Sequence, residues 1–434
     1  MAIATLAPTN SQTSALQTRL RIWSVSMVVS FLIGWGLWLG ASTVPNLDTS
    51  GTPLGGDFLM FYSAGRMVQN DPLALYDESR QQAEFLQVIP GLEPGSCRLP
   101  YRYPPLVAIL MAPLSHLSYS TAFAFFTALS IALGCLVVKM LDAVEIQLFG
   151  ESSHCCGWWL LGWPIAIETI LGGQQSLMGL AIAVAVILLV QKNYTVWAGV
   201  ILGLACYKPN LLMFFALAMI VRYPRMIGGL ACTAMATLVL QLLAVGPACI
   251  ENYVVLASQL ATESWGLETP SVKVHGLAPI LALWWPGYER KILLTIGILG
   301  CVAWSWCDRR IQGDKLAQAA SWSCIVIWNA LCNPYLPVYD LLLLAIPTLL
   351  LLRVGHEHRL STRCLVVLLG AITLGPHLSQ AIAARTGTQL FPAFLASMGI
   401  AVACFLGNRS LGRQGLSGSP CTGSTVLATN SERA

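Results

Sequence analysis

Long hydrophobic stretches separated by short polar segments run through most of the chain. The first extends from Ile22 to about Ser42, which is long enough to cross roughly 30 Å of hydrocarbon as a helix. Further stretches follow at about 105–140, 157–171, 174–191, 195–206, 209–222, 226–246, 290–306, 316–332, 337–352, 364–383 and 388–406. The pattern predicts an all-α polytopic membrane protein with about 12 transmembrane helices.

Two places depart from a simple series of spans. The stretch 105–140 is too long for one span, so we expect a bent or interfacial entry at Pro113. The stretches 195–206 and 209–222 are short, and Pro209 divides them. Broken helices of this kind are tolerated only where the freed backbone groups face protein or water.

Composition agrees with a membrane location and excludes several classes of function. Hydrophobic residues make up 56% of the 434 and charged residues only 10%, whereas a soluble domain carries about a quarter charged residues. A net charge of +4 without a basic tract argues against nucleic-acid binding. Many of the fourteen cysteines lie in or beside apolar stretches and none forms a CxxC pair, so we expect them to pack as small hydrophobic residues.

The positions of Lys and Arg predict the orientation, because cytoplasmic loops are enriched in them. Placing Arg19 and Arg21 in the cytoplasm makes residues 1–21 a cytoplasmic tail. The segment 43–103 then becomes a large first extracytoplasmic loop, in which seven acidic residues face four arginines. Most later basic positions also become cytoplasmic: Lys192, Arg222, Arg225, Arg309, Arg310, Lys315, Arg353, Arg359, Arg363, Arg409 and Arg413.

Two segments disagree with this orientation: the inward loop 141–156 is acidic, and the basic pair after Glu289 falls outside. The second disagreement depends on Gly276–Pro286, which we interpret as a re-entrant or surface segment; if it crossed the membrane, everything after it would invert. We therefore expect one membrane domain over 22–406. The Gly/Ser/Thr-rich segment 407–434 is predicted to be a disordered cytoplasmic tail.

The first candidate for chemistry is Asp57, which lies just beyond the first span beside two glycines. Glycine lets a backbone approach closely, and the residues that follow, including Tyr62 and Arg66, have the pattern of an amphipathic helix ending near Asp71. The alternative is that Asp57 only caps this helix, since aspartate is favoured at that position.

Two further polar groups lie at predicted membrane boundaries. Arg102 stands between tyrosines before the second stretch, where the alternative is an interfacial anchor. Glu168 lies within or close to an apolar stretch, and an ionisable residue at that depth is a functional candidate by default. Gln174 follows it after a glycine pair, and a tight polar turn is the rival interpretation.

The remaining candidates also fall on the predicted outward side. Lys208 and Asn210 flank the Pro209 break, where a lysine could neutralise a phosphate as a compact point charge; a snorkelling lysine is the alternative. His275 alone is more often structural, whereas Tyr339 and Asp340 begin a span and place a carboxylate at membrane depth.

Each of these signals is weak alone, but their shared membrane face allows them to close into one cleft. The chain contains no GxGxxG, P-loop, HExxH or cysteine metal pattern, so nothing in it points to nucleotide or zinc chemistry. Acidic, basic and amide side chains at an interface suit a lipid phosphate donor and a hydroxylated acceptor.

Taken in order, these motifs resemble glycosyltransferase family 87, the polyprenyl-phosphate-mannose-dependent membrane enzymes of the GT-C class. The resemblance covers roughly residues 20–405. One departure is the stretch before Tyr339-Asp340, where members often carry a histidine and this chain has Leu336-Pro337-Val338. The matching motifs are Asp57-Phe58 to Tyr62 with Ala64, Leu75-Tyr76-Asp77, Tyr103-Pro104-Pro105-Leu106 with Pro113-Leu114, Gly173-Gln174, Lys208-Pro209-Asn210, and Pro334-Tyr335 with Tyr339-Asp340.

The resemblance implies a GT-C-like fold that transfers a hexose, mannose by preference, from polyprenyl phosphate to a glycolipid or glycan with inversion. It further implies a multi-pass protein of the plasma membrane, among membrane lipids, whose active site is extracytoplasmic. We expect Asp57 to be the general base and the lipid tail to lie near 195–222; no metal or other cofactor is expected. Lys208, Arg66, Arg102 and His275 are the candidates for binding the donor phosphate. Glu168, Gln174, Asn210, Tyr62, Tyr339 and Asp340 are the candidates for binding sugar or acceptor.

Two other functions remain open from the residues. A transporter or lipid-linked-sugar flippase would also have about twelve helices, broken segments and intramembrane polar groups, although the chain shows no internal repeat. A non-catalytic scaffold in envelope synthesis would tolerate the loss of the Asp57 carboxylate.

Overall fold

The computed structural model describes residues 10–42, 44–150, 155–262, 271–311, 313–357 and 361–417, and about four fifths of these are helical. Their only β-type pairing is an isolated bridge between Leu47 and Pro53. The helices are α1 (Asn10–Gly40), α2 (Phe58–Asn70), η1 (Pro72–Tyr76), α3 (Glu78–Val88), α4 (Pro105–Met111), η2 (Ala112–His116), α5 (Tyr119–Phe149), α6 (Cys155–Gly162), α7 (Pro164–Leu171), α8 (Ser176–Gln191), α9 (Thr195–Gly203), η3 (Leu204–Tyr207), α10 (Met213–Arg222), α11 (Met226–Thr262), η4 (Ser271–Lys273), α12 (Ala278–Trp284), α13 (Glu289–Arg310), α14 (Lys315–Cys332), η5 (Val338–Leu344), α15 (Ala345–Glu357), α16 (Thr362–Thr386) and α17 (Phe391–Ser417).

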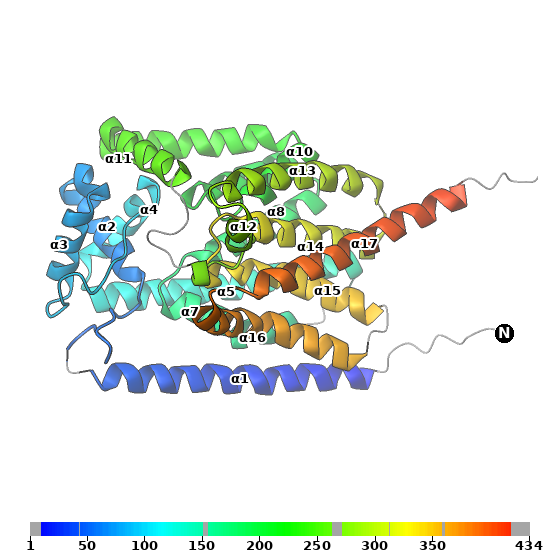
Figure 1. Ribbon diagram of the computed structural model, residues 1–434, viewed down its shortest axis with the longest axis horizontal. Helices are drawn as coiled ribbons and strands as arrows, with labels where there is room; N and C mark the ends of the chain where they lie inside the picture. Colours follow the sequence, from blue (N-terminus) through cyan, green and yellow to red (C-terminus); the bar gives the residue numbers. More distant parts are fainter. Residues whose placement is uncertain are drawn as a thin grey trace, which may run out of the picture.

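Six segments within the described ranges are long and apolar enough to cross a membrane: Thr18–Leu37, Tyr119–Phe149, Met226–Leu260, Glu289–Arg310, Val338–Gly355 and Arg363–Thr386. Shorter apolar helices pack among them, as Figure 1 shows for α8, α10 and α17. The all-α prediction is therefore confirmed for the described residues, and six such helices agree with a multi-pass membrane protein. A total of about 12 crossings stays a prediction.

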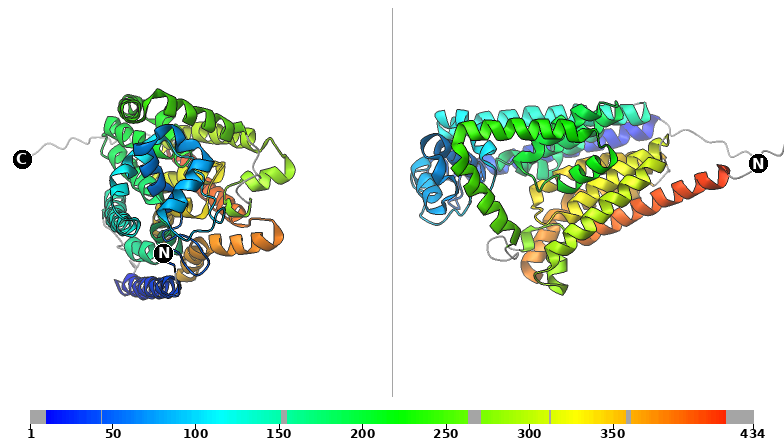
Figure 2. Two further views of the ribbon diagram at one scale, coloured as in Figure 1. Left: turned by 90° about the vertical axis from the view of Figure 1, so that its left-hand side faces the viewer. Right: turned by 90° about the horizontal axis from the view of Figure 1, so that it is seen from above.

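The segment after α1 forms a separate layer at one end of the bundle (Figure 1). Seen from that end, α2 and α3 lie in front of the longer helices (Figure 2, left). The start of α1 and the end of α17 lie at the opposite end (Figure 1). Of the predicted tails, residues 1–9 and 418–434 lie outside the described residues, whereas 10–21 and 407–417 belong to α1 and α17.

The overlong stretch 105–140 is divided as its Pro113 suggests. The helix α4 passes into the 3₁₀ turn η2, which contains Pro113, and α5 begins after Ser118 caps it. The helix α2 packs closely against the end of α4, because a Cβ on Gly65 would lie only 2.8 Å from the backbone of Met111. Glycine at this position therefore allows α2 to touch the end of α4.

The break between α9 and α10 faces protein. The side chain of Asn329 on α14 donates to the Leu211 carbonyl at 2.9 Å and accepts from the amides of Phe214 and Phe215 at 3.2 and 3.1 Å. These bonds satisfy backbone groups that a continuous helix would have paired internally. The chain can thus hold Lys208 in an irregular segment beside a bundle helix.

The segment 276–286 does not have the length of a span. Its helix α12 has seven residues, which rise about 10 Å against roughly 30 Å of hydrocarbon. The structure therefore favours a re-entrant or surface segment here.

Candidate active site

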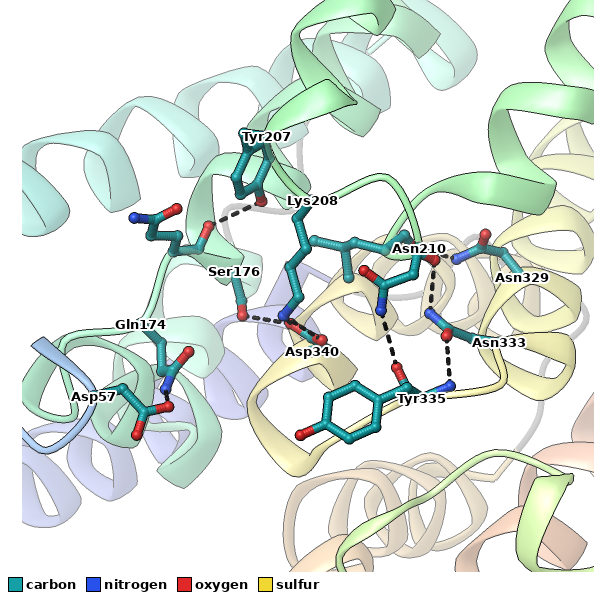
Figure 3. A network of polar contacts seen from close by, with 12 residues as sticks. Asp57, Gln174, Ser176, Tyr207, Lys208, Asn210, Asn329, Asn333, Tyr335 and Asp340 are labelled. Carbon is teal, nitrogen blue, oxygen red and sulfur yellow. Dashed lines mark hydrogen bonds and ion pairs between the residues drawn. The ribbon is translucent and has the colours of Figure 1, made fainter. Parts of the chain in front are cut away.

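A cavity of about 1320 Å³ lies between the end layer and the bundle, because residues of both line it. Segments far apart in the sequence contribute to its wall. Six of the predicted site residues line it directly: Asp57, Arg102, Glu168, Lys208, Asn210 and Tyr339. Gln174 and Asp340 lie behind this wall and contact it through Asp57 and Lys208 (Figure 3).

Asp57 occupies the position before the first residue of α2, but its side chain makes no capping hydrogen bond. The capping interpretation is therefore wrong for the carboxylate. Instead, Asp57 Oδ2 accepts a hydrogen bond from the Gln174 side-chain amide (Figure 3). The backbone amide of Asp57 also donates to the Gly172 carbonyl at 3.2 Å, so two glycine-containing turns from separate parts of the chain meet at this carboxylate.

The glycines at this meeting point are required by geometry. Gly173 has a φ of +67°, and a Cβ there would lie 2.7 Å from the Gly55 carbonyl oxygen. A side chain at this position would therefore combine an unfavourable backbone conformation with a steric clash. The close contact of the turns keeps Gln174 against Asp57.

The surroundings of Asp57 make its carboxylate easier to protonate. Burial raises the pKa of Asp57 above the usual aspartate value, and this effect exceeds the lowering produced by the Gln174 hydrogen bond and by the charges of Lys208 and Lys273. The charge of Glu168 raises the pKa further. A carboxylate whose pKa is shifted towards neutrality is better matched to taking a proton as a general base.

Lys208 is held in a buried ion pair. Its Nζ lies 2.7 Å from Asp340 Oδ1 and 2.6 Å from Asp340 Oδ2, and the Ser176 hydroxyl donates to Oδ1 at 2.7 Å (Figure 3). The ammonium also lies over the ring of Tyr339, 5.0 Å from its centre. Asp340 is fully buried and does not line the cavity, so its place in the structure is that of a partner for Lys208 rather than of a sugar ligand.

Asn210 is supported by the turn that precedes η5. Its side-chain amide donates to the Tyr335 carbonyl at 3.4 Å, and the backbone carbonyl of Asn210 accepts from the Asn333 side chain at 3.0 Å (Figure 3). Asn333 in turn accepts from the Tyr335 amide at 3.0 Å. This network fixes the segment after Lys208 against the segment before Tyr339.

The structure does not bring Arg66, Tyr62 or His275 to the cavity wall. Arg66 forms an ion pair with Glu84 at 2.5 Å, and the Tyr62 hydroxyl donates to the Leu117 carbonyl at 2.7 Å. His275 is fully buried, and burial lowers its pKa. A neutral, enclosed imidazole lacks the positive charge that a phosphate ligand would require, so the proposed phosphate-binding role of His275 has no support in this geometry.

Two residues outside the predicted set of site residues also belong to this site. Lys273 lines the cavity, and its charge contributes to the pKa of Asp57. His377 on α16 places Nε2 3.0 Å from Glu168 Oε2. An ionisable residue inside the apolar stretch 364–383 was the signal that could have drawn attention to His377.

Among the described residues, no group of three His, Cys, Asp or Glu side chains could hold a metal ion. The expectation that the reaction needs no metal stays a prediction. Arg98, Arg102, Lys208, Lys273 and Arg290 supply cationic groups to the cavity wall.

Comparison with known proteins agrees with this architecture. The family model of glycosyltransferase family 87 matches residues 101–334, more than half of the chain. The chain belongs to glycosyltransferase family 87. No curated protein and no solved structure matches it. A family 87 protein is a membrane glycosyltransferase, and the matched region contains Glu168, Gln174, Lys208 and Asn210; Asp57 and Asp340 lie outside it and join the site only through the fold.

Proposed function

We propose that this glycosyltransferase moves a hexose, mannose by preference, from polyprenyl phosphate to a hydroxyl group of an extracytoplasmic glycolipid or glycan. The observation that carries the proposal is the placement of Asp57, a carboxylate with a raised pKa, in the same cavity as Lys208 and Lys273. A base and nearby cations are the two groups that transfer from a sugar phosphate requires.

The reaction follows from these positions. Asp57 takes the proton of the acceptor hydroxyl while that oxygen attacks the anomeric carbon from the face opposite the phosphate. The new carbon–oxygen bond forms as the bond to the phosphate oxygen breaks, so the configuration inverts and polyprenyl phosphate leaves with the bonding electrons. General-base catalysis of this kind contributes about 10²–10⁴-fold to the rate.

The leaving phosphate meets cations that line the same cavity. Lys208, oriented by Asp340, and Lys273 provide ammonium groups, and Arg102 provides a guanidinium group. Gln174 keeps the Asp57 carboxylate in place, whereas Glu168, Asn210 and Tyr339 face the sugar or the acceptor. Arg66, Tyr62 and His275 have no part in this mechanism because their side chains are engaged elsewhere.

The cavity also offers a route for the lipid tail. Apolar residues of α11 and α13, among them Ala257, Leu260 and Leu294, form part of its wall. Val254 and Val255 on α11 expose 58% and 50% of their surface, as expected for a lipid-facing helix. By contrast, α9 packs closely on α11 through Gly199 and Gly229. We therefore place the tail between α11 and α13 and not along α9.

The test uses the purified chain in lipid nanodiscs with radiolabelled polyprenyl-phosphate mannose and a panel of glycolipid and glycan acceptors. Transfer by the wild-type chain is expected, and Asp57→Asn should abolish turnover while the donor still binds. Asp71→Asn is a matched control, because Asp71 pairs with Arg80 outside the cavity. Movement of labelled sugar lipid across vesicles without transfer to any acceptor would refute the proposal in favour of a flippase.

A further inference from the structure

The cavity continues beyond the reacting groups onto the end layer, where its lining becomes exposed. Glu78, Gln82 and Leu86 follow one another at intervals of four residues on α3, so they share one face of that helix. All three line the cavity, together with Arg98 from the segment that follows α3. We call Glu78, Gln82, Leu86 and Arg98 the outer rim. In Figure 1, α3 lies at the outer edge of the molecule, away from the long helices.

Hydrogen bonds fix the two parts of the outer rim against each other. The Asp77 carboxylate caps α3 by accepting from the amides of Ser79 and Arg80 at 2.8 and 3.2 Å. Gln82 donates to the Cys97 carbonyl at 2.8 Å, and Gln81 accepts from the Tyr101 amide at 3.0 Å. Two consecutive glutamines therefore hold the Arg98 segment against α3.

The chemistry of the outer rim differs from that of the interior. Near Asp57, the wall carries the cations that a phosphate requires. The outer rim instead has one acid, Glu78, and one base, Arg98, so its formal charges cancel. Leu86 adds an apolar surface beside the amide of Gln82. Charged and amide groups that donate and accept hydrogen bonds, next to small apolar surfaces, match a neutral polyhydroxylated chain better than an anion or a lipid tail.

We propose that the outer rim binds the glycan chain of the acceptor, in the sugar units that precede the unit whose hydroxyl reacts. This inference rests on the proposed function, because it takes the acceptor to be a glycan. It assigns the two ends of the cavity to different substrates. The donor reaches Asp57 from the side of the cavity that α11 and α13 line, and the acceptor reaches it from the exposed side along α3.

A binding experiment tests the inference without turnover. It measures the affinity of the nanodisc-embedded chain for soluble manno-oligosaccharides of one to four units. In the wild type, affinity should rise about tenfold from one unit to four, the size expected for about one added hydrogen bond to a charged group. Arg98→Ala should remove most of this gain. Arg80→Ala is the matched control, because Arg80 lies on the neighbouring helix α3, pairs with Asp71 and does not line the cavity; it should retain the gain.

Three results would overturn the proposal: affinity independent of chain length in the wild type, no oligosaccharide binding at all, or an undiminished gain in Arg98→Ala. Each concerns the outer rim alone. Sugar transfer is measured separately with the labelled donor, so a chain that binds oligosaccharides through Arg98 but transfers no sugar would refute the proposed function and leave the rim as a glycan site.

Discussion

The buried pair of Lys208 and Asp340 permits a quantitative prediction. The Lys208 side chain is 6% exposed and that of Asp340 is not exposed, and the closest approach of the charged atoms is 2.6 Å. Asp340→Asn keeps the shape of the side chain and leaves an acceptor for the Ser176 hydroxyl, but it removes the charge opposite the ammonium. The variant therefore isolates the electrostatic contribution of the pair.

The expected magnitude follows from burial. At this separation, two unit charges attract by about 6 kcal/mol for an effective dielectric constant near 20. Much of this attraction is offset by the cost of removing both ions from water. Breaking only one side of such a pair is different, because the remaining charge stays buried without compensation, which costs about 3–5 kcal/mol. We expect Asp340→Asn to lower the free energy of unfolding by that amount.

The assay is equilibrium unfolding in mixed micelles with increasing denaturing detergent, applied to a double-mutant cycle of Asp340→Asn and Lys208→Met. The double variant removes both charges, so it should recover most of the stability that Asp340→Asn loses. It should nevertheless remain inactive, because the ammonium group that orients the donor phosphate in the proposed reaction is gone. The reasoning is refuted if Asp340→Asn costs less than about 1 kcal/mol, or if the two substitutions are simply additive.

Two further predictions concern Asp57 and Asn329. The pKa of Asp57 is raised, and only the ionised carboxylate can act as the base. Turnover should therefore increase with pH, with a midpoint above the usual aspartate pKa of about 3.9. A rate that has already reached its plateau at about pH 3.9 would contradict this prediction. The native state binds the Asp57 proton more tightly than the unfolded state does. The free energy of unfolding should therefore fall as the pH rises from the Asp57 pKa of the unfolded state to that of the folded state. Across this pH range, Asp57→Asn should gain stability relative to the wild type. Asn329→Ala should cost about 3 kcal/mol or more, because it leaves two amides and one carbonyl of the broken segment without their partner. The same unfolding assay measures this cost, and a change below about 1 kcal/mol would show that other groups or water satisfy the break.

The sequence predicted those site residues whose signals are local. Asp57 between glycines, Lys208 beside a proline and Glu168 in an apolar stretch each break a simple pattern, and each lines the cavity. The long apolar stretches predicted the all-α membrane fold for the same reason. The number of crossings is less accessible, because short helices such as α9 and α10 meet at a break whose partners come from α14.

Residues whose role depends on the docking of a helix were not predictable in this way. Tyr62 and Arg66 lie one turn apart on α2, and their direction is decided by contacts with Leu117 and Glu84, which the pattern of α2 does not reveal. His377 and Glu168 are separated by 209 positions. No local rule pairs them, because their contact exists only after α16 packs beside α7.

The charge arrangement around Lys208 explains why a second cation is needed at the site. An ammonium group has three N–H donors, and contacts with both oxygens of Asp340 occupy two of them. One donor remains for a phosphate oxygen, and its direction is fixed because the ion pair holds the head group between Asp340 and the ring of Tyr339. The pair carries no net charge, however, so it orients a phosphate without balancing the negative charge that develops when the sugar leaves. In the proposed mechanism, that charge is met by the other cations of the same wall, among them Lys273 and Arg102. We therefore propose that Lys208 mainly orients the phosphate, and that Lys273 and Arg102 stabilise its charge.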